Sequence, residues 1–270
     1  MLEIEDVHKA FNQGTAYEVR ALQGVSAKID EGSFTIVIGT NGSGKSCLLN
    51  TIAGAYPVDK GRIRLDERDI TYWPEYKRAA LMGRVFQNPF TGTAPSLTIA
   101  ENLALAACRG ARRGLGAAVS SRMRQRMRDT VARLNLSLED RLDTPIGTLS
   151  GGQRQALTLL MAVWQKPHLL LLDEHTAALD PKSAEQVVTL SEEIVGRERL
   201  TTLMVTHSMQ QAARLGDRLL MMHRGKVVLE LRGDQKRRVR AEELLARFEE
   251  IRRADLLDES AAELLERCYV

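Results

Sequence analysis

The chain has 270 residues, and its apolar side chains, 44% of the total, suffice to bury the core of one large domain or two small ones. Its 38 basic and 35 acidic residues leave a net charge of +3, an excess too small to indicate a nucleic-acid partner. Cys47, Cys108 and Cys268 are far apart and form no C-x-x-C pair, which argues against a zinc site and a disulfide framework. The acidic start MLEIEDVHK predicts no export signal, and the longest apolar runs fall short of the ~20 residues of a membrane helix.

Short β-type runs recur along the chain and alternate with helical patterns. They occupy residues 2–7, 25–29, 34–38, 62–65, 84–86, 169–172, 201–205, 218–222 and 226–230. A helical pattern over 181–195 starts with a proline, which suits a first helical turn. The alternation predicts an α/β fold with a mostly parallel sheet, in which the all-apolar runs are buried strands.

Two regions interrupt this alternation. Between Gln87 and Gln165 strand signals fade and Ala, Leu, Met and Arg dominate, which predicts a helical subdomain inserted at about 88–165. The arginine-rich stretch 109–128 inside it is typical of a solvated or partner-facing helix; an RNA or phospholipid contact is the alternative.

The sequence after Gly233 is charged and helical in pattern. We therefore expect a core domain over 1–232 and a charged helical extension over 233–270. Leu244, Leu245, Phe248 and Ile251 share one helix face, which favours packing on the core, with a partner or second-subunit contact as the alternative.

The stretch GTNGSGKS, residues 39–46, has the G-x-x-x-x-G-K-[ST] pattern between a β-type run and a helical run. Glycines at 39, 42 and 44 let backbone N–H groups curl around a phosphate, and the following helix adds positive charge at its N-terminus. In this setting Lys45 holds the β and γ phosphates of a nucleotide and Ser46 ligates Mg²⁺. The pattern predicts a P-loop that binds ATP and Mg²⁺.

Polar side chains follow three of the predicted strands. Asp173 and Glu174 end the run LLLLDE, where the first suits the Mg²⁺ shell and the second suits a general base that polarises the attacking water. His207 and Gln87 also follow strands, at the sheet edge where open α/β sheets bind ligands. Gln87 could reach Mg²⁺ or the water.

The stretch LSGGQ, residues 149–153, poses a separate question. A serine and two glycines precede the helical pattern RQALTLLMAVWQ, an arrangement that predicts a second anion site at a helix N-terminus. The P-loop already supplies one phosphate site.

Six motifs in this order resemble those of the nucleotide-binding subunits of ATP-binding cassette (ABC) proteins. They are GTNGSGKS, Gln87, LSGGQ, LLLLDE, AALD (177–180) and His207, and the resemblance covers at least residues 2–232. It implies a P-loop NTPase core with an antiparallel β subdomain and an inserted helical subdomain.

The resemblance also implies roles for individual residues. Phe11 would stack on adenine, although an apolar core position is an alternative for it, and Gln87 would link the nucleotide to the helical region. Asp180 would lie in the loop that crosses between subunits, and His207 would sense the γ phosphate. The nucleotide-binding set implied by the matched motifs is Phe11, Gly39, Asn41, Gly42, Ser43, Gly44, Lys45, Ser46, Cys47, Ser150, Gly151, Gly152, Gln153 and Asp180.

In ABC proteins LSGGQ faces the P-loop nucleotide of a second subunit. The resemblance therefore implies that Ser150, Gly151 and Gly152 donate to a γ phosphate bound elsewhere, in a head-to-tail dimer with a copy or a close relative. ATP would then hold the dimer together, and its hydrolysis would release it.

A finer similarity, over 74–107 and the two later motifs, is to bacterial importers of the tryptophan/tyrosine type. It implies an ATPase subunit on the cytoplasmic face of the inner membrane, serving a separate permease and an extracytoplasmic substrate-binding protein, with an amino acid as one candidate solute. A soluble ABC ATPase of assembly or repair, and a subunit of an exporter or lipid-extraction complex, are the alternatives. A regulator without turnover would need a damaged catalytic set, whereas Asp173, Glu174 and His207 are all present.

Three positions depart from the commonest family pattern. Cys47 replaces a threonine and so removes a hydroxyl near the α phosphate, which alters affinity or makes the loop sensitive to thiol reagents. His175 replaces a proline and Ala177 replaces a serine, and both match the finer subfamily.

Overall fold

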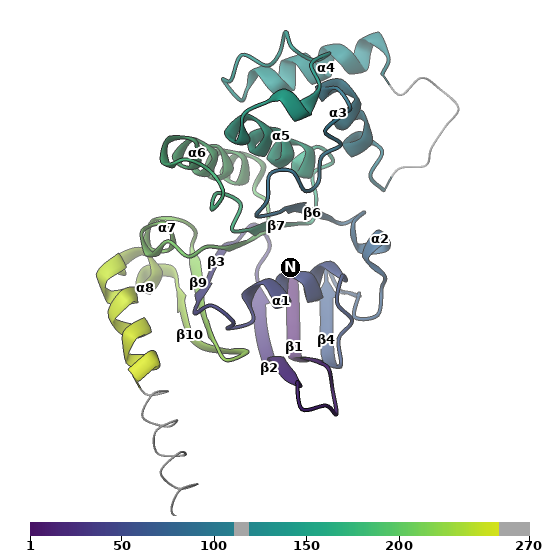
Figure 1. Ribbon diagram of the computed structural model, residues 1–270. Helices are drawn as coiled ribbons and strands as arrows, with labels where there is room; N and C mark the ends of the chain where they lie inside the picture. Colours follow the sequence, from purple (N-terminus) through teal and green to yellow (C-terminus); the bar gives the residue numbers. More distant parts are fainter. Residues whose placement is uncertain (111–118, 254–270) are drawn as a thin grey trace, which may run out of the picture.

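The structure is a computed structural model that describes residues 1–110 and 119–253. Two β-sheets and a group of helices make up this part of the chain. In Figure 1 helices α3, α4 and α5 gather at one end and strands β1, β2 and β4 at the other, with β6 and β7 between them. Within the described ranges no helix is long and apolar enough to span a bilayer.

The larger sheet has six strands in the order β10-β9-β3-β8-β7-β6, and only the β9–β10 pair is antiparallel. The strands are β3 (Phe34–Gly39), β6 (Met82–Val85), β7 (Leu169–Asp173), β8 (Thr202–Val205), β9 (Arg218–His223) and β10 (Lys226–Arg232). Strands β3, β7 and β8 are buried along their whole length because helices or the second sheet cover both faces. The predicted, mostly parallel α/β sheet is confirmed.

The smaller sheet is antiparallel, in the order β2-β1-β4-β5. Its strands are β1 (Leu2–Phe11), β2 (Val19–Ile29), β4 (Lys60–Leu65) and β5 (Arg68–Asp69). Strand β2 begins well before the predicted residue 25, because its first part pairs with the end of β1 up to the Phe11–Val19 rung. These early β-type runs form the antiparallel sheet that the family resemblance implied, separate from the parallel one.

Helix α1 (Lys45–Ala53) fills the space between the two sheets. Its buried Leu48, Leu49 and Ile52 belong to a core cluster that draws on strands of both sheets, including Leu2 of β1 and Val37 of β3. The opposite face of the larger sheet is covered by α6 (Pro181–Glu198) and α7 (Met209–Arg214). The short helix α8 (Gly233–Arg238) lies beside α7, where Lys236 donates to the Ala213 carbonyl oxygen, and α2 (Glu75–Arg78) precedes β6. The P-loop helix is thus fixed by burial on two sides.

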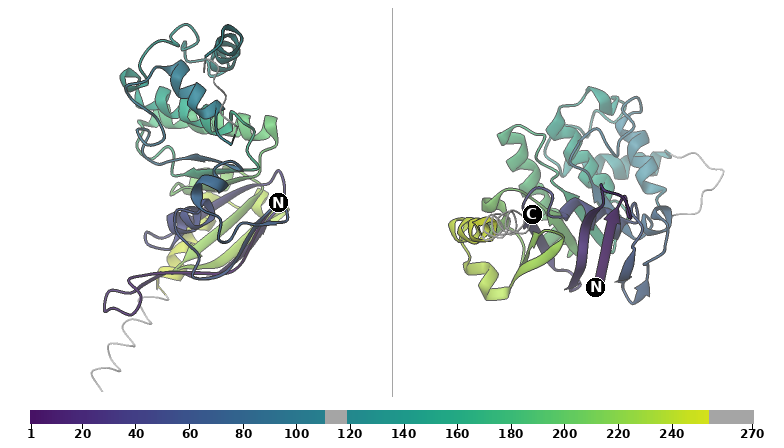
Figure 2. Two further views of the ribbon diagram at one scale, coloured as in Figure 1. Left: turned by 90° about the vertical axis from the view of Figure 1, so that its right-hand side faces the viewer. Right: turned by 60° about the horizontal axis from the view of Figure 1, so that its bottom comes forward.

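Between β6 and β7 the described residues form the helices α3 (Ile99–Ala107), α4 (Ser121–Ala132) and α5 (Gly151–Val163) and a 3₁₀ turn (Ile146–Thr148). They share a separate apolar core that includes Leu103, Val131 and Leu157. Figure 2 shows this group set apart from the sheets when the molecule is turned. The helical character of the segment agrees with its composition, while the limits 88–165 of a subdomain stay a prediction.

The described part of the C-terminal extension packs on the core. After α8, residues 241–253 are helical, and Leu244 is fully buried against the cluster under α6 and α7, with Ile251 beside it. The first of the two expected alternatives therefore holds for this segment. Residues 254–270, including Cys268, and residues 111–118 of the arginine-rich stretch lie outside the described residues.

Candidate functional site

The loop of residues 39–46 bends back tightly between β3 and α1. A Cβ atom on Gly39 would lie 2.2 Å from the Met222 carbonyl oxygen, and one on Gly44 would lie 2.4 Å from the Ala21 carbonyl oxygen. Gly44 also has φ 98°, in the left-handed region that favours glycine. Strands of both sheets therefore press on the loop and hold its backbone in one shape.

Two side chains of this loop are buried and directed inward. The Lys45 ammonium group donates to the carbonyl oxygens of Gly39 (3.1 Å) and Thr40 (2.9 Å), and burial lowers the pKa of Lys45. The Ser43 hydroxyl is buried without a hydrogen-bond partner among the described residues. A buried cation and an unsatisfied hydroxyl inside a glycine loop at a helix N-terminus fit an oxyanion such as a phosphate.

A hydroxyl and a carboxylate meet beside the loop. The Ser46 hydroxyl donates to a carboxylate oxygen of Asp173, at the end of β7, over 3.3 Å. Burial is the main cause that raises the pKa of Asp173, although the Arg84 guanidinium lies 3.7 Å away and acts in the opposite direction. Two oxygen ligands of this kind, poised to share a cation, fit Mg²⁺, which would neutralise phosphate charge when bound.

Glu174 and His207 form the next contact along the same sheet edge. Nε2 of His207 lies 2.6 Å from Oε1 of Glu174, whose side chain is only 10% exposed. Glu174 has φ 44°, and its N–H donates to the Val205 carbonyl oxygen over 3.1 Å. A non-glycine residue at positive φ costs free energy, and the hydrogen bond to β8 helps to hold the Glu174 backbone in this conformation.

Gln87 follows β6 at the same level of the sheet as Glu174 after β7. Strands β6 and β7 pair at the Val85–Leu172 rung, so Gln87 and Glu174 each lie two residues beyond it. Gln87 is exposed. The structure thus brings the glutamine to the same sheet edge as Asp173 and Glu174, as parallel strands require.

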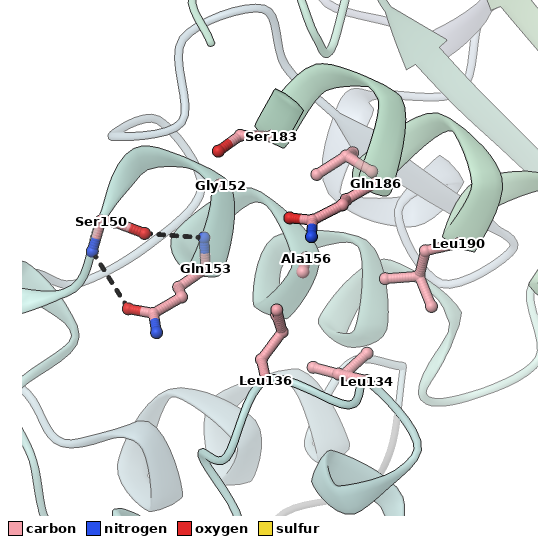
Figure 3. Close-up of a pocket in the computed structure, with 10 residues that line it drawn as sticks. Leu134, Leu136, Ser150, Gly152, Gln153, Ala156, Ser183, Gln186 and Leu190 are labelled. Atoms are coloured by element: carbon pink, nitrogen blue, oxygen red, sulfur yellow. Dashed lines mark hydrogen bonds between the residues drawn. The ribbon is translucent and has the colours of Figure 1, made fainter. Parts of the chain in front are cut away.

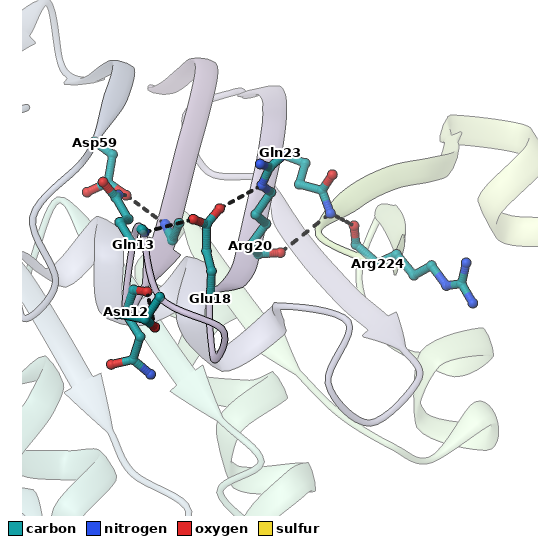
Figure 4. Close-up of polar contacts among 10 residues, drawn as sticks. Asn12, Gln13, Glu18, Arg20, Gln23, Asp59 and Arg224 are labelled. Carbon is teal, nitrogen blue, oxygen red and sulfur yellow. Dashed lines mark hydrogen bonds and ion pairs between the residues drawn. The ribbon is translucent and has the colours of Figure 1, made fainter.

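Phe11 ends β1, and its ring is half-buried. It packs edge-on against Tyr56, with ring centroids 5.1 Å apart and an interplanar angle of 83°. Asp59 stabilises the chain on either side of Phe11: it accepts hydrogen bonds from the side chains of Lys9 and Gln13 and from the backbone of Ala10 (Figure 4). The position leaves part of the ring available to a ligand.

Residues 150–153 form the N-terminus of α5. The Ser150 hydroxyl accepts from the Gln153 backbone N–H, and the Gln153 side chain accepts from the Ser150 backbone N–H, a reciprocal capping box (Figure 3). Ser150 and Gly151 are exposed. A cavity of about 210 Å³ beside them is lined by apolar and uncharged polar residues such as Leu136 and Gln186.

The N-terminus of α6 lies next to that of α5. Asp180 caps α6 by accepting from the Ser183 backbone N–H over 3.1 Å. A Cβ on Gly152 would lie 2.8 Å from the Ser183 Cβ, so the glycine allows the two helix ends to touch. Among the described residues no hydrogen bond or ion pair joins Ser150, Gln153 or Asp180 to the P-loop.

Two polar residues that support the site, one partly and one fully buried, were not predicted from the sequence. Arg84, the charged residue of β6, approaches Asp173 and donates to the Asn50 side chain over 2.8 Å. Gln155, fully buried on α5, donates to the carbonyl oxygens of Phe86 and His175. Each is a polar residue in a mostly apolar run, which is the one signal the sequence offered.

The C-terminal helical segment borders the P-loop. Leu245, Phe248 and Arg252, spaced on one helical face, line a groove together with the loop residues Thr40 and Asn41 and with His207 and Met209. Leu245 is 48% exposed. This face of the extension is therefore close to the candidate site, a position that the sequence did not indicate.

A tight glycine loop with a buried lysine, followed at the same sheet edge by Ser46, Asp173 and Glu174, defines a P-loop nucleotide-binding ATPase. The profile of the family described as "ABC transporter" matches residues 22–177. The chain belongs to this family, and it is an ATP-hydrolysing subunit of an ABC transporter. The resemblance first seen in the six motifs is confirmed.

Named relatives agree with this assignment. The chain is 42% identical over 249 residues to a tyrosine transport ATP-binding protein of Clostridioides difficile, covering 92% of this chain and 99% of the relative. It is 35% identical to a lipoprotein-releasing system ATP-binding protein of Caulobacter vibrioides, covering 82% and 92%. Among solved structures it resembles the dimeric, post-hydrolysis ATP-binding cassette MJ0796 bound to ADP and phosphate, with a TM-score of 0.72 and 28% identity over 86% of this chain and 98% of the other.

Proposed function

We propose that the chain is the ATPase subunit of a bacterial importer and works as a head-to-tail dimer around two ATP molecules. The P-loop of one subunit and residues 150–152 of the other would enclose each nucleotide. A separate permease would carry the solute, and the tyrosine transport relative favours an amino acid. An extracytoplasmic substrate-binding protein would deliver it, and the subunit would sit on the cytoplasmic face of the inner membrane.

The exposed N-terminus of α5 carries the dimer proposal. Its backbone N–H groups and the Ser150 hydroxyl suit an anion. The cavity beside it is lined by uncharged residues, and within the described residues nothing bonds it to the P-loop of its own chain. An anion site without a cation becomes complete when the phosphates held by another subunit's Lys45 are placed against it.

We assign the chemistry to the sheet edge. Glu174 would take a proton from the attacking water, with His207 held against its carboxylate to contact the γ phosphate. Ser46 and Asp173 would hold Mg²⁺, and Gln87 would approach the metal or the water from β6.

The remaining assigned residues bind and enclose the nucleotide. Phe11 would stack on the base at the end of β1, and Asp180 would cross toward the second subunit. The other P-loop and α5 residues in this set are Gly39, Asn41, Gly42, Ser43, Gly44, Cys47, Gly151, Gly152 and Gln153.

The face for the permease would be the segment after Gln87. Phe90 and Leu105 there are large apolar side chains, 60% and 57% exposed, in the part of the chain between β6 and α4. In the proposed complex these side chains would be covered by apolar residues of the permease, which would remove their surface from water. The lipoprotein-releasing relative favours an exporter or lipid-extraction complex as the second candidate.

The variant Glu174→Gln tests the ATPase and dimer assignments together. Hydrolysis is expected to fall at least about 100-fold, since the base is lost while ATP binding is kept. Size-exclusion chromatography with light scattering should then show an ATP-dependent dimer. Glu193→Gln, at an exposed position of α6, is the control. Normal turnover in the Glu174 variant would remove this residue from the role of base.

Co-purification from detergent-solubilised membranes, after tagging at the native locus, tests the transport partner. A multi-spanning permease with a neighbouring binding protein supports the importer. A lipoprotein-type complex supports the second candidate, and cytosolic partners alone contradict both.

A further inference from the structure

A single buried amide connects the two half-sites of this subunit. Gln155 lies on α5, five residues after Ser150, and is fully buried. Its Nε2 donates to the Phe86 carbonyl oxygen over 3.0 Å and to the His175 carbonyl oxygen over 2.7 Å. Phe86 directly precedes Gln87, and His175 directly follows Glu174.

The chemistry of the amide fixes its orientation. An amide nitrogen has two hydrogens, and here each is used by one carbonyl oxygen. Rotation by 180° would set Oε1 against both carbonyl oxygens, which is repulsive. Oε1 itself is buried with no partner among the described residues, so the two bonds from Nε2 are what hold this side chain in the interior.

In the proposed dimer, the loops that accept these two hydrogen bonds and the N-terminus of α5 contact different nucleotides. This step rests on the proposed head-to-tail dimer: Gln87 and Glu174 face the subunit's own ATP, whereas Ser150 faces the ATP of the partner subunit. Helix α5 runs without interruption from Gly151 to Val163, so Ser150 and Gln155 move with one rigid element.

We propose that Gln155 is a positioning residue that couples the two ATP sites of the dimer. When Ser150 closes on the partner's nucleotide, α5 moves and carries the Phe86 and His175 carbonyl groups with it. The same amide thereby aligns Gln87 and Glu174 on the subunit's own nucleotide. The coupling is reciprocal, so ATP that orders the loops of Gln87 and Glu174 also holds Ser150 of the same subunit against the partner's nucleotide, through the same two hydrogen bonds.

A mixed dimer tests this role in isolation. One subunit carries Glu174→Gln, so its own site is inactive, and the other subunit is wild type. The remaining hydrolysis then takes place at the wild-type subunit's nucleotide, closed by Ser150 of the inactive subunit. In the inactive subunit the Gln155 bonds hold Ser150 in line with the loops that surround that subunit's own ATP. Adding Gln155→Leu there should therefore misplace Ser150 at the wild-type subunit's nucleotide and lower this hydrolysis about tenfold, since small misplacements of an active site carry large rate losses.

The KM for ATP should stay within about twofold, since Gln155 touches neither the P-loop nor Phe11. Thr158→Val is the matched control on the same helix. Thr158 is buried, and among the described residues its hydroxyl bonds only to the Arg154 carbonyl oxygen of α5 itself. Thr158→Val removes a buried hydrogen bond to a carbonyl oxygen but keeps the two bonds from Gln155 to Phe86 and His175. Turnover of the mixed dimer should therefore be unchanged within about twofold.

Gln155→Asn is a second variant in case the leucine variant does not fold. Its amide is one methylene shorter and cannot reach both carbonyl oxygens, so the same loss of mixed-dimer turnover is expected. Unchanged turnover with either folded Gln155 variant in the inactive subunit overturns the coupling.

Ser150→Arg in the inactive subunit separates this proposal from the dimer on which it rests. If that change lowers turnover and the Gln155 variants do not, only the coupling is wrong. If Ser150→Arg has no effect, the head-to-tail arrangement fails, and the coupling falls with it.

Discussion

The chain contains two loops of the anion-binding type, and they differ in almost every physical respect. Residues 39–46 are pressed between the two sheets, with Ser43 and Lys45 buried. Residues 150–153 form an exposed helix end that is stabilised by the capping box of Ser150 and Gln153. Both present backbone N–H groups, but only the first has a lysine.

This difference accounts for the division of labour in the proposed dimer, in which the first loop binds ATP by itself and the second acts on ATP held by the other subunit. A helix N-terminus contributes roughly half a unit of positive charge, which water and salt screen when it is exposed. The P-loop adds a full charge on Lys45 in a buried setting, where electrostatic interactions are stronger. The α5 terminus is suited to recognise phosphates that are already bound and neutralised elsewhere.

Removing the lysine should have the largest effect on activity. In Lys45→Ala the loop keeps its glycines but loses its cation, so hydrolysis is expected to fall about 100- to 1,000-fold. ATP binding should weaken in parallel, which a fluorescent-nucleotide titration measures. Lys182→Ala, an exposed lysine at the start of α6, is the control and should behave as wild type. Wild-type affinity in Lys45→Ala would mean that the backbone alone binds the phosphates.

Obstructing the second loop should separate binding from turnover. Ser150→Arg places a bulky side chain where a second subunit would approach, so hydrolysis should fall about 10- to 100-fold. ATP binding to the monomer should be unchanged, because the P-loop is untouched.

The control for this change is Ser120→Arg. Ser120 also caps an exposed helix end, by accepting from the Met123 backbone N–H over 3.2 Å, but it lies on α4. The same cap is lost there without an effect on closure. Equal activity of the two serine variants would contradict the cross-subunit role of α5.

The first loop and its sheet were predictable because their signals are local. The apolar run that forms β3, the glycine pattern after it and the carboxylates that end β7 are all contiguous in sequence. Their meeting at one edge follows from parallel pairing alone. The role of the second loop came only from a family resemblance, because no local pattern states which nucleotide a helix end faces.

The contacts that support both loops were not predictable, because they join residues far apart in the chain. Gln155 bonds to Phe86 across 69 positions, and Arg84 reaches Asp173 from a neighbouring strand. The early start of β2 depends likewise on the length of its partner β1. Sequence periodicity reports which face is buried, not which polar group a buried side chain meets.

His175, whose carbonyl oxygen accepts from Gln155, should make the stability of the protein sensitive to acid. Its Nε2 lies 2.9 Å from the Ser191 hydroxyl oxygen. Because that hydroxyl donates its own hydrogen to the Val187 carbonyl oxygen, Nε2 of the neutral ring carries the proton and Nδ1 is unprotonated. Complete burial lowers the pKa of His175 to about 4.

Because the pKa of His175 in the folded state is below its unfolded value, the unfolded chain binds the proton first. The resulting stability is present above about pH 6.5 and is lost as pH falls toward 4. Denaturant unfolding should show a loss of about 3 kcal/mol over this interval from this residue. In His175→Leu, which cannot titrate, this loss of unfolding free energy between pH 6.5 and 4 should disappear. An unchanged dependence of the unfolding free energy on pH would mean that the His175 ring is not buried in its neutral form.

The smallest expected effect lies directly after the first loop, at Cys47 of α1. Burial raises the pKa of its thiol, so the thiolate is scarce at neutral pH and reaction with a thiol reagent should be slower than for a free cysteine. Cys47→Thr restores a hydroxyl donor at the phosphate side, and one added hydrogen bond is worth about 1 kcal/mol. ATP should then bind about fivefold more tightly, and Cys47→Ser should give a similar gain if the hydroxyl alone is responsible. A tighter complex with threonine but not with serine would assign the gain to packing of the methyl group, and the loop would then depend on its apolar neighbours as well as on its polar groups.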